Sequence, residues 1–227
     1  MTAPRHGFSD PAAVAGYADR PPRLVPGFRD MQRMARLLLA ENTPDDAQVL
    51  VVGAGGGLEL KVFAEGCPNW RLHGVDPALP MLRLAEQTLG PLMDRVTLTH
   101  GYIDAAPEGP FDAAACLLTL HFVSADERLG MLTAIRRRLR PGAPFVVAHF
   151  SIPDAPGDRA LWMSRYAAFA IDSGVARSEA GHAATTIEAM LPILSPGADE
   201  ALLTAAGFDK VALVYAGFTF RGWVARA

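Results

Sequence analysis

Apolar positions follow two different spacings along this chain, and the alternation between them predicts its secondary structure. Continuous apolar runs at residues 49–52 and 145–150 are typical of strands buried on both faces of a parallel sheet. Other segments place apolar side chains three or four positions apart, which predicts helices with one buried face. The first such face comprises Met31, Met34, Leu37 and Leu38. Strands that alternate with helices imply right-handed crossovers and a mainly parallel sheet.

Predicted strands and helices alternate along most of the chain. The strands lie at residues 49–52, 71–75, 96–100, 111–117 and 145–150. The helices span residues 28–41, 79–89, 124–139 and 196–206, and one more runs from the glycines after residue 52 to about Glu65. Two final apolar runs, 211–216 and 218–225, flank Gly217 and predict a closing antiparallel hairpin. We therefore expect an α/β fold with a doubly wound, mainly parallel, seven-stranded sheet.

Two segments lie outside this alternation. Residues 1–26 are rich in Pro, Gly and Arg and predict an irregular lead-in, so that residues 1–45 hold the lead-in and the first helix. Residues 154–194 have helical periodicity and aromatic side chains, which predicts a helical cap over the C-terminal edge of the sheet. Because no repeat or linker divides the chain, we expect residues 1–227 to form a single domain.

Glycines gather directly after the first predicted strand, in the sequence VVGAGGGLEL. Glycine can take the positive φ angles of a tight turn, and it lets a bound nucleotide approach the backbone. Asp76 follows the second strand ~20 residues later, where folds of this kind hold a ribose by its hydroxyl groups. Together these features predict an adenosine-containing cofactor, although an ordinary strand-to-helix turn is the alternative for the loop alone. Leu58 occupies the place of the last glycine in the dinucleotide fingerprint G-x-G-x-x-G, so that fingerprint fits poorly.

Composition narrows the class of protein. A net charge of −3 and a sequence pI of about 6.1 give no reason to expect a large basic surface for nucleic acid. The two cysteines, Cys67 and Cys116, have no partners at metal-ligand spacing, so we expect reduced thiols and no metal site. No apolar stretch is long enough for a membrane span, and charged residues interrupt the first twenty positions. We therefore expect a soluble, cytoplasmic protein with no membrane partner.

The order of elements, the glycine loop, Asp76 and the closing hairpin resemble the class I methyltransferases that depend on S-adenosyl-L-methionine (SAM). Three segments are similar to the carboxy-SAM synthase branch, whose members make a carboxylated SAM for the modification of wobble uridine in tRNA. These segments are RLVPGFRDM at 23–31, LLTLHFVSADER at 117–128 and IEAMLPILSPGADEALLTAAGF at 187–208. The resemblance implies a Rossmann-like methyltransferase fold, SAM as the cofactor and S-adenosyl-L-homocysteine (SAH) as the product.

Four positions depart from the pattern of that branch. Val51 stands where the branch has an acid before the first glycine, and Leu117 stands where it has an asparagine at the end of the fourth strand. Tyr102 stands in place of the usual adenine-binding aspartate. Ala184 replaces the arginine that would pair with the extra carboxylate of carboxy-SAM. A buried carboxylate without a cation costs several kcal/mol, so the sequence favours SAM over carboxy-SAM. A synthase would need another cation, such as Arg165, Arg177 or Arg221.

The motifs and the resemblance together assign a set of cofactor-binding residues: Phe28, Gly53, Ala54, Gly55, Gly57, Asp76, Pro77, Tyr102, Ile103 and Leu117. Ile103 can offer its backbone N–H to adenine, and Tyr102 can stack on the ring. His121, just past the fourth strand, is the candidate catalytic base, because imidazole titrates near neutral pH. A hydrogen-bonded loop histidine is the alternative. His149 is a second candidate, for which a structural role is favoured.

We expect a SAM-dependent methyltransferase that acts on a small, fairly apolar acceptor enclosed by the helical cap. Methyl transfer is a displacement at a sulfonium, so alignment and the exclusion of water can supply most of the catalysis. Two alternatives stay open: a carboxy-SAM synthase-like enzyme, and a non-catalytic binding protein with the SAM fold, which Val51 and Tyr102 motivate. The expected partner is a small-molecule acceptor rather than nucleic acid, and a homodimer is left open.

Overall fold

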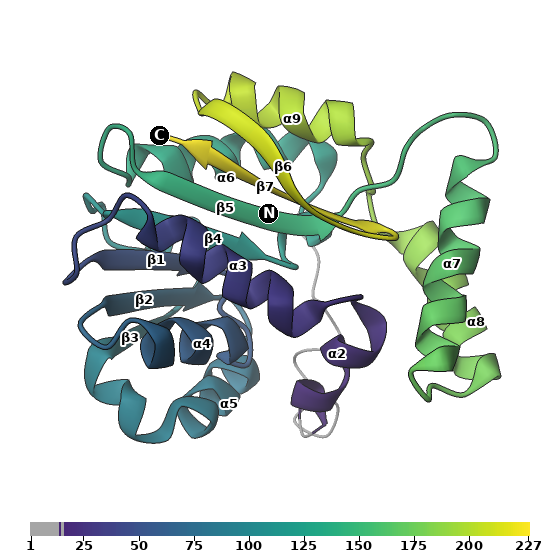
Figure 1. Cartoon of the computed structure of the whole chain (residues 1–227), viewed down its shortest axis with the longest axis horizontal. Coiled ribbons are helices and arrows are strands. Elements are labelled where there is room, and N and C mark those ends of the chain that lie inside the picture. Colours follow the sequence, from purple (N-terminus) through teal and green to yellow (C-terminus); the bar gives the residue numbers. More distant parts are fainter. Residues whose placement is uncertain (1–13, 15) are drawn as a thin grey trace.

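The computed structural model describes residues 14 and 16–227 and contains a seven-stranded sheet of order β3-β2-β1-β4-β5-β7-β6 (Figure 1). The parallel strands are β1 (Gln48–Val52), β2 (Arg71–Asp76), β3 (Val96–His100), β4 (Ala113–Leu117) and β5 (Pro144–Phe150). Antiparallel to them, β7 (Phe220–Arg226) pairs with β5, and β6 (Asp209–Gly217) pairs with β7 at the edge. The predicted fold class is confirmed. The strand order reverses between β1 and β4, which is where such sheets bind ligands.

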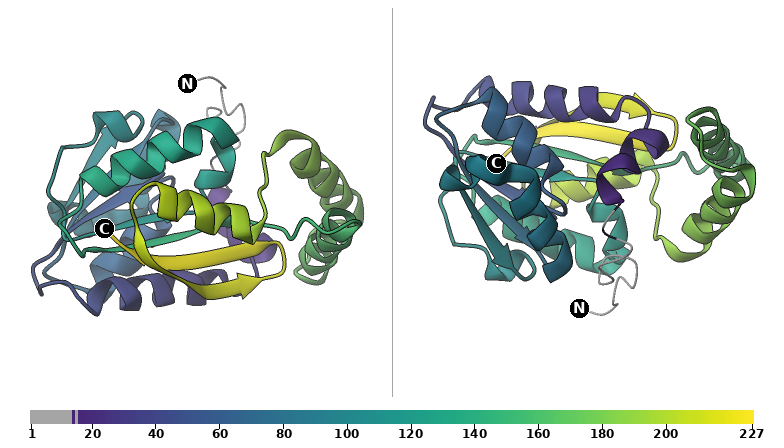
Figure 2. Two further views of the ribbon diagram at one scale, coloured as in Figure 1. Left: turned by 90° about the horizontal axis from the view of Figure 1, so that it is seen from above. Right: turned by 90° about the horizontal axis from the view of Figure 1, so that it is seen from below.

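Helices cover both faces of this sheet (Figure 2). One face carries α3 (Phe28–Ala40), α4 (Leu58–Gly66) and α5 (Leu79–Leu89), and the other carries α6 (Ala125–Arg137) and α9 (Pro196–Ala205). Successive residues of a strand point to opposite faces, so an apolar run can serve two cores. Within residues 16–227, no helix is both long enough and apolar enough to cross a membrane.

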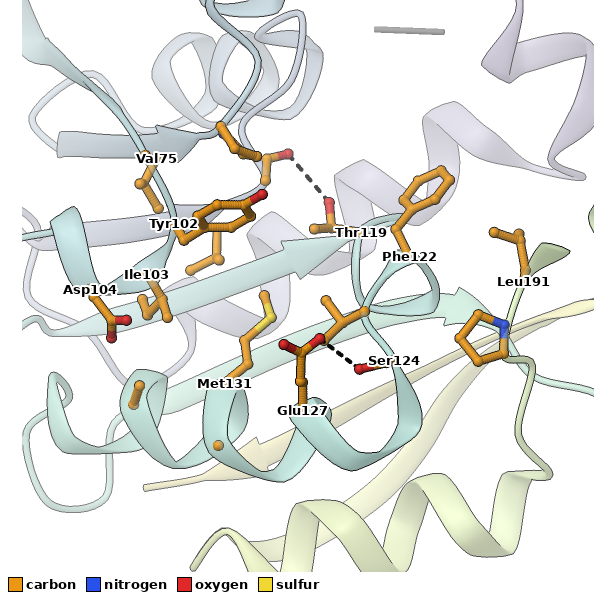
Figure 3. Close-up of a pocket in the computed structure, with 18 of the residues that line it drawn as sticks. Val75, Tyr102, Ile103, Asp104, Thr119, Phe122, Ser124, Glu127, Met131 and Leu191 are labelled. Atoms are coloured by element: carbon orange, nitrogen blue, oxygen red, sulfur yellow. Dashed lines mark hydrogen bonds between the residues drawn. The ribbon is translucent and has the colours of Figure 1, made fainter. Parts of the chain in front are cut away.

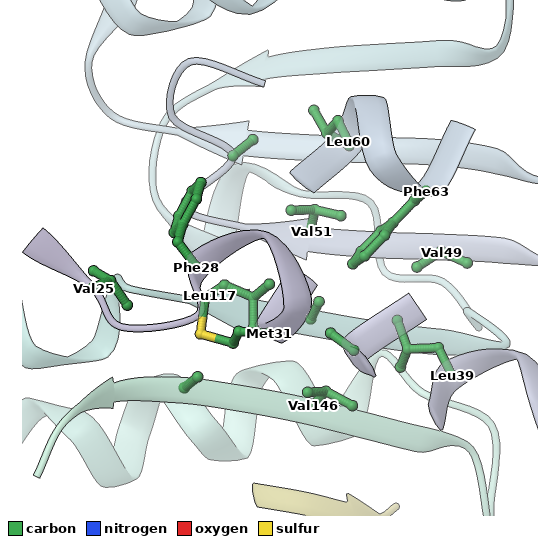
Figure 4. Close-up of a cluster of buried hydrophobic side chains, with 14 of the residues drawn as sticks. Val25, Phe28, Met31, Leu39, Val49, Val51, Leu60, Phe63, Leu117 and Val146 are labelled. Carbon is green, nitrogen blue, oxygen red and sulfur yellow. The ribbon is translucent and has the colours of Figure 1, made fainter. Parts of the chain in front are cut away.

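Two hydrophobic cores lie on either side of β1. Val49 and Val51 pack beneath α3 and α4 with Phe28, Leu39 and Phe63, the cluster drawn in Figure 4. Leu50 and Val52 face the other way, toward buried residues of α6 and α9 such as Leu132, Ile135 and Leu203. Because β1 packs against a core on each face, the position at which the following loop begins is fixed.

The lead-in is more regular than the sequence analysis expects. It holds η1 (Tyr17–Asp19) and α2 (Pro21–Leu24) before α3 begins. Pro21 and Pro22 open α2, where the fixed φ of proline suits the first turn of a helix. Residues 1–13 and 15, which belong to the same predicted segment, lie outside the described residues.

The segment predicted as a cap contains α7 (Asp158–Asp172) and α8 (Arg177–Met190), two helices that pack together beyond the C-terminal ends of the parallel strands (Figure 1). Tyr166 anchors α7, since its ring lies 5.7 Å from that of Phe150 at the end of β5. Gly157 and Gly174 flank α7 with φ angles of 84° and 90°, whereas Gly181 lies inside α8. The structure thus has two helices in this segment, and their role as a lid stays a prediction.

Element bounds differ from the expected ones mainly at two turns. The fourth strand begins at Ala113 rather than at residue 111, because Phe111 forms an isolated bridge with Leu139. The terminal strands are joined by Phe218 and Thr219 rather than at Gly217, with Phe218 at a φ of 50°.

Candidate active site

The glycine loop follows β1 and turns sharply into α4. Gly53 and Gly57 have φ angles of 76° and 79°, in the region that favours glycine. A Cβ at Gly53 would collide with Thr119, and one at Gly57 would lie 2.9 Å from Ala85 Cα. Glycine is therefore required at both positions by the turn and by the close approach of neighbouring segments.

The carboxylate of Asp76 holds this loop in place. Its Oδ2 accepts a hydrogen bond from Gly55 N–H at 3.0 Å, and its Oδ1 accepts one from Ala78 N–H at 2.8 Å. Asp76 ends β2 next to the loop, as the sequence predicts, but this loop-fixing role is visible only in the structure. Asp76 is only 5% exposed, yet its side chain lines a cavity beside the loop.

A cavity of about 830 Å³ opens between the strand ends and α6 (Figure 3). Val75 and Ile103 form its apolar floor, Tyr102 lies over one side, and Met131 faces them from α6. The end of α8 closes another side through Ala189, Met190, Leu191 and Pro192. This volume lies within the range of small-molecule binding sites, about 300–1,000 Å³.

A second, tighter cavity of about 40 Å³ also lies against the first glycine of the loop. Its walls come from segments far apart in the chain and include Tyr17 from η1, Phe28 and Gln32 from α3, and Glu59 from α4. Gly53, Thr119 and Phe122 line both cavities, so the two are neighbours. The Thr119 hydroxyl lies 3.4 Å from Gly53 O and 3.1 Å from Leu117 O, two carbonyls to which it can donate (Figure 3).

Most of the predicted cofactor-binding residues line these two cavities. Pro77, Tyr102 and Ile103 line the larger one, Gly53 lines both, and the smaller one has Phe28, Gly55, Asp76 and Leu117. Ala54 and Gly57 line neither: Ala54 is fully buried under the loop, and Gly57 caps the start of α4. Contact of these residues with the cofactor stays a prediction.

The ionisable side chains described along the two cavities are all acidic. Glu59 and Asp76 line the smaller cavity, and Asp104 and Glu127 line the larger one. Among the described residues that line either cavity, none is Arg, Lys or His. Burial, helped by the negative charge of Asp76, raises the pKa of Glu59 to about 8. The site therefore favours a ligand that carries positive charge.

His121 is placed differently from what a catalytic base requires. His121 is only 3% exposed. Its Nδ1 accepts a hydrogen bond from the backbone N–H of Phe150 at 3.3 Å, and its ring packs edge-on against the Phe150 ring. It does not line either cavity. This hydrogen bond joins η4 (Leu120–Phe122) to the end of β5, which matches the alternative of a hydrogen-bonded loop histidine. Its role as a base stays a prediction that the geometry does not favour.

His149 has a structural setting. Its Nε2 lies 3.8 Å from Asp199 Oδ1 and its Nδ1 lies 2.8 Å from Phe150 O. Burial lowers the pKa of His149, and the ring packs near Trp223 in the second core. This agrees with the structural role that the sequence analysis favours.

Sequence reasoning missed Glu59 as a site residue. The available signal was helical spacing: on α4, Glu59 lies on the buried face, one turn before Phe63. Its burial comes from α3 and η1, which pack over α4 from a distant part of the chain. Thr119 and Met131 were missed for the same reason, since their partners are remote in sequence.

Comparisons with known proteins agree with the fold and with the class of enzyme. Residues 49–142 match the family model described as a methyltransferase domain. The carboxy-S-adenosyl-L-methionine synthase of Colwellia psychrerythraea is 24% identical, over 95% of this chain and 90% of its own length. A solved SAM-dependent methyltransferase from Aquifex aeolicus is 17% identical and has a TM-score of 0.64. The match spans 96% of this chain and 98% of the Aquifex chain. Human N-acetylserotonin methyltransferase in complex with SAM, 14% identical, has a TM-score of 0.68 over 99% of this chain.

The fold is that of the class I methyltransferases, and residues 49–142 match a methyltransferase domain. Together with the carboxy-SAM synthases among the similar proteins, this confirms the predicted resemblance, the class of enzyme and SAM as the cofactor. The chain spans only 60% of the length of the human enzyme. The acceptor of that enzyme therefore says nothing about the acceptor here.

We predict that Asp76→Ala weakens SAH binding by ~1–3 kcal/mol, because a charge-assisted hydrogen bond is lost and the loop loses its support. Calorimetry measures the change. Asp45→Ala, at an exposed loop position before β1, is the matched control and should bind SAH like the wild type. Unchanged affinity in Asp76→Ala would remove Asp76 from the binding site.

Proposed function

We propose that this enzyme transfers the methyl group of SAM to a small, fairly apolar acceptor that binds in the larger cavity. The observation that carries the proposal is the cavity of about 830 Å³, walled by apolar side chains beside the glycine loop. Its volume is near the top of the small-molecule range, which leaves space for an acceptor beside the adenosyl group.

The residues present fit SAM along its whole length. Ile103 and Tyr102 border the part of the larger cavity next to Val75, where an adenine ring would find an apolar floor and a ring to stack on. Asp76 can accept from ribose hydroxyls, and the acidic smaller cavity suits the α-ammonium group of the methionyl end. Bound SAM supplies an electrophilic methyl group, and this arrangement would direct it toward the junction of the two cavities.

Residues at that junction are suited to alignment rather than to proton transfer. Phe122 lines both cavities, and Leu191 lies near it just after the end of α8 (Figure 3). Pro192 also lines the larger cavity. Apolar walls exclude water and hold an acceptor within reach, which is what a displacement reaction needs most. An acceptor with an acidic proton would need no base from the protein.

A carboxy-SAM synthase is the second candidate, because curated relatives of that name cover most of the chain. The charges oppose it. Ala184 brings no cation, and the Arg165 and Arg221 guanidinium groups lie 4.4 Å and 5.1 Å from the ring centre of Trp162. Arg221 also donates to the backbone carbonyls of Phe218 and Phe220. Neither arginine lines the two cavities, and neither does Arg177.

We predict that carboxy-SAM binds no more tightly than SAM, since no cation of the lining residues can pair with its extra carboxylate. Competition against SAH at pH 7 measures both affinities on one protein sample. A clear preference for carboxy-SAM would show that another arginine serves the carboxylate, and the synthase would then be the leading function.

Leu191 offers a test of the acceptor site. With methyl-labelled SAM, we expect at least one member of a panel of small phenols, thiols and aromatic amines to be methylated. Leu191→Glu should lower kcat/KM for that acceptor at least ~10-fold, because a charge enters an apolar wall, while SAH affinity stays within about twofold.

Leu161→Glu is the matched control for this substitution. Leu161 is 47% exposed on α7 and lies away from both cavities, so the variant should keep wild-type activity. Equal activity of Leu191→Glu and the wild type would place the acceptor elsewhere. No labelled product at saturating SAM would favour the non-catalytic alternative.

We also predict that residues 154–194 act as a mobile lid that selects the acceptor, since the end of this segment walls the larger cavity. Hydrogen exchange should be faster there than in β1 and β5, and it should slow when SAH and an acceptor are added together. Exchange as slow as that of the strands in the free protein would identify the segment as core.

A further inference from the structure

Glu59 occupies an unexpected position for an acidic side chain. It lies in the first turn of α4 on the same face as Leu60 and Phe63, and it is only 8% exposed. Instead of reaching solvent, its carboxyl group lines the smaller cavity beside the glycine loop.

The groups that face Glu59 give it no positive partner. Asp76 faces it from the end of β2, the hydroxyl of Tyr17 from η1, and the neutral amide of Gln32 from α3. No residue that the structure describes along this cavity is a cation. Burial and Asp76 raise the pKa of Glu59 to about 8, so its carboxyl is mostly protonated at pH 7.

The position of the cavity indicates which ligand group reaches it. Asp76, the ribose candidate, lines this cavity, whereas Tyr102 and Ile103, the adenine candidates, line the larger one, and Gly53 lines both. A SAM molecule with its adenine near Ile103 therefore directs its methionyl end toward Glu59. That end carries an α-ammonium group, a compact cation with three N–H donors.

We propose that Glu59 binds the α-ammonium group of the methionyl moiety and gives up its carboxyl proton to solvent when that group arrives. This assignment rests on SAM as the cofactor and adds a binding residue to its site. Only the O–H bond of the carboxyl group breaks, and the proton passes to the buffer while the ligand keeps its charge. Binding thus converts a neutral carboxyl group and an ammonium cation into an ion pair inside the smaller cavity.

Two other roles are consistent with the position of Glu59. It can be a permanently protonated side chain that only fills space, or it can pair with the sulfonium of SAM. SAH has the ammonium but no sulfonium, and 5′-methylthioadenosine has neither. The two compounds therefore separate the three roles.

Proton release on binding is the direct measurement. Titration calorimetry at pH 7 in phosphate and in Tris, whose ionisation enthalpies differ, counts the protons. A carboxyl group with a pKa of about 8 holds ~0.9 proton at pH 7, so SAH should release about that number. 5′-Methylthioadenosine should release almost none.

Glu59→Gln tests the residue itself, because the amide resembles the protonated carboxyl in shape and should let the protein fold. SAH should bind it without proton release, about 10- to 100-fold more weakly than wild type at pH 8.5, and with similar affinity at pH 6. Glu65→Gln, which removes an exposed acid from the same helix, is the control and should behave like the wild type.

The pH profile supplies a second readout. Because the pKa of Glu59 is raised in the folded protein, its proton must be removed before it can pair with the ammonium group. The affinity for SAH should therefore rise about tenfold from pH 6 to pH 7 and level off above pH 8. Binding of SAH without proton release by the wild type would overturn the assignment and leave the cofactor intact. Proton release that persists in Glu59→Gln would overturn it equally. A protein that binds neither SAH nor 5′-methylthioadenosine would contradict the cofactor itself.

Discussion

The site depends on one carboxylate that connects two strands. Asp76, at the end of β2, accepts hydrogen bonds from the backbone of the glycine loop after β1 and from Ala78 at the start of the next connection. The loop is thereby fixed at the point where the strand order of the sheet reverses. Both cavities lie against this loop, and Gly53 lines both of them.

A second constraint is that the ionisable side chains described along the two cavities are all acidic. Burial of an acid lowers the stability of the free protein, because its ionised form loses hydration. Two cores, packed on opposite faces of β1, supply the stability that allows such a site. A positively charged group of the cofactor offsets this desolvation cost when it binds. The acids that destabilise the free protein therefore stabilise the complex with the cofactor.

The arrangement of charge also separates this chain from relatives of similar sequence. Carboxy-SAM synthases match most of its length, and the similar segments cover the helix before β1, the end of β4 and α9. The resemblance implies an arginine in those enzymes where this chain has Ala184. Among the residues described along the two cavities, this chain has no cation, so we expect it to prefer SAM over the carboxylated form.

Local patterns made most of the fold predictable. Apolar runs and helical spacing depend on near neighbours, so β1, β5 and α5 were placed within a residue or two. The glycine loop and Asp76 were predictable because a tight turn and a ribose acceptor demand particular residue types at a fixed spacing. The positions of Glu59 and His121 could not be predicted. The burial of Glu59 depends on α3 and η1, and the orientation of His121 depends on its hydrogen bond with Phe150. Contacts between distant segments leave no local trace in the sequence.

The most direct test of the account is the identity of the nucleoside that the protein carries. The purified protein is denatured, and the released small molecules are analysed by mass spectrometry, before and after incubation with an equimolar mixture of SAM and carboxy-SAM. We predict SAM or SAH in both extracts, because the acidic site selects positive charge. Carboxy-SAM as the main species, or no adenosine-containing ligand after incubation, would contradict the account.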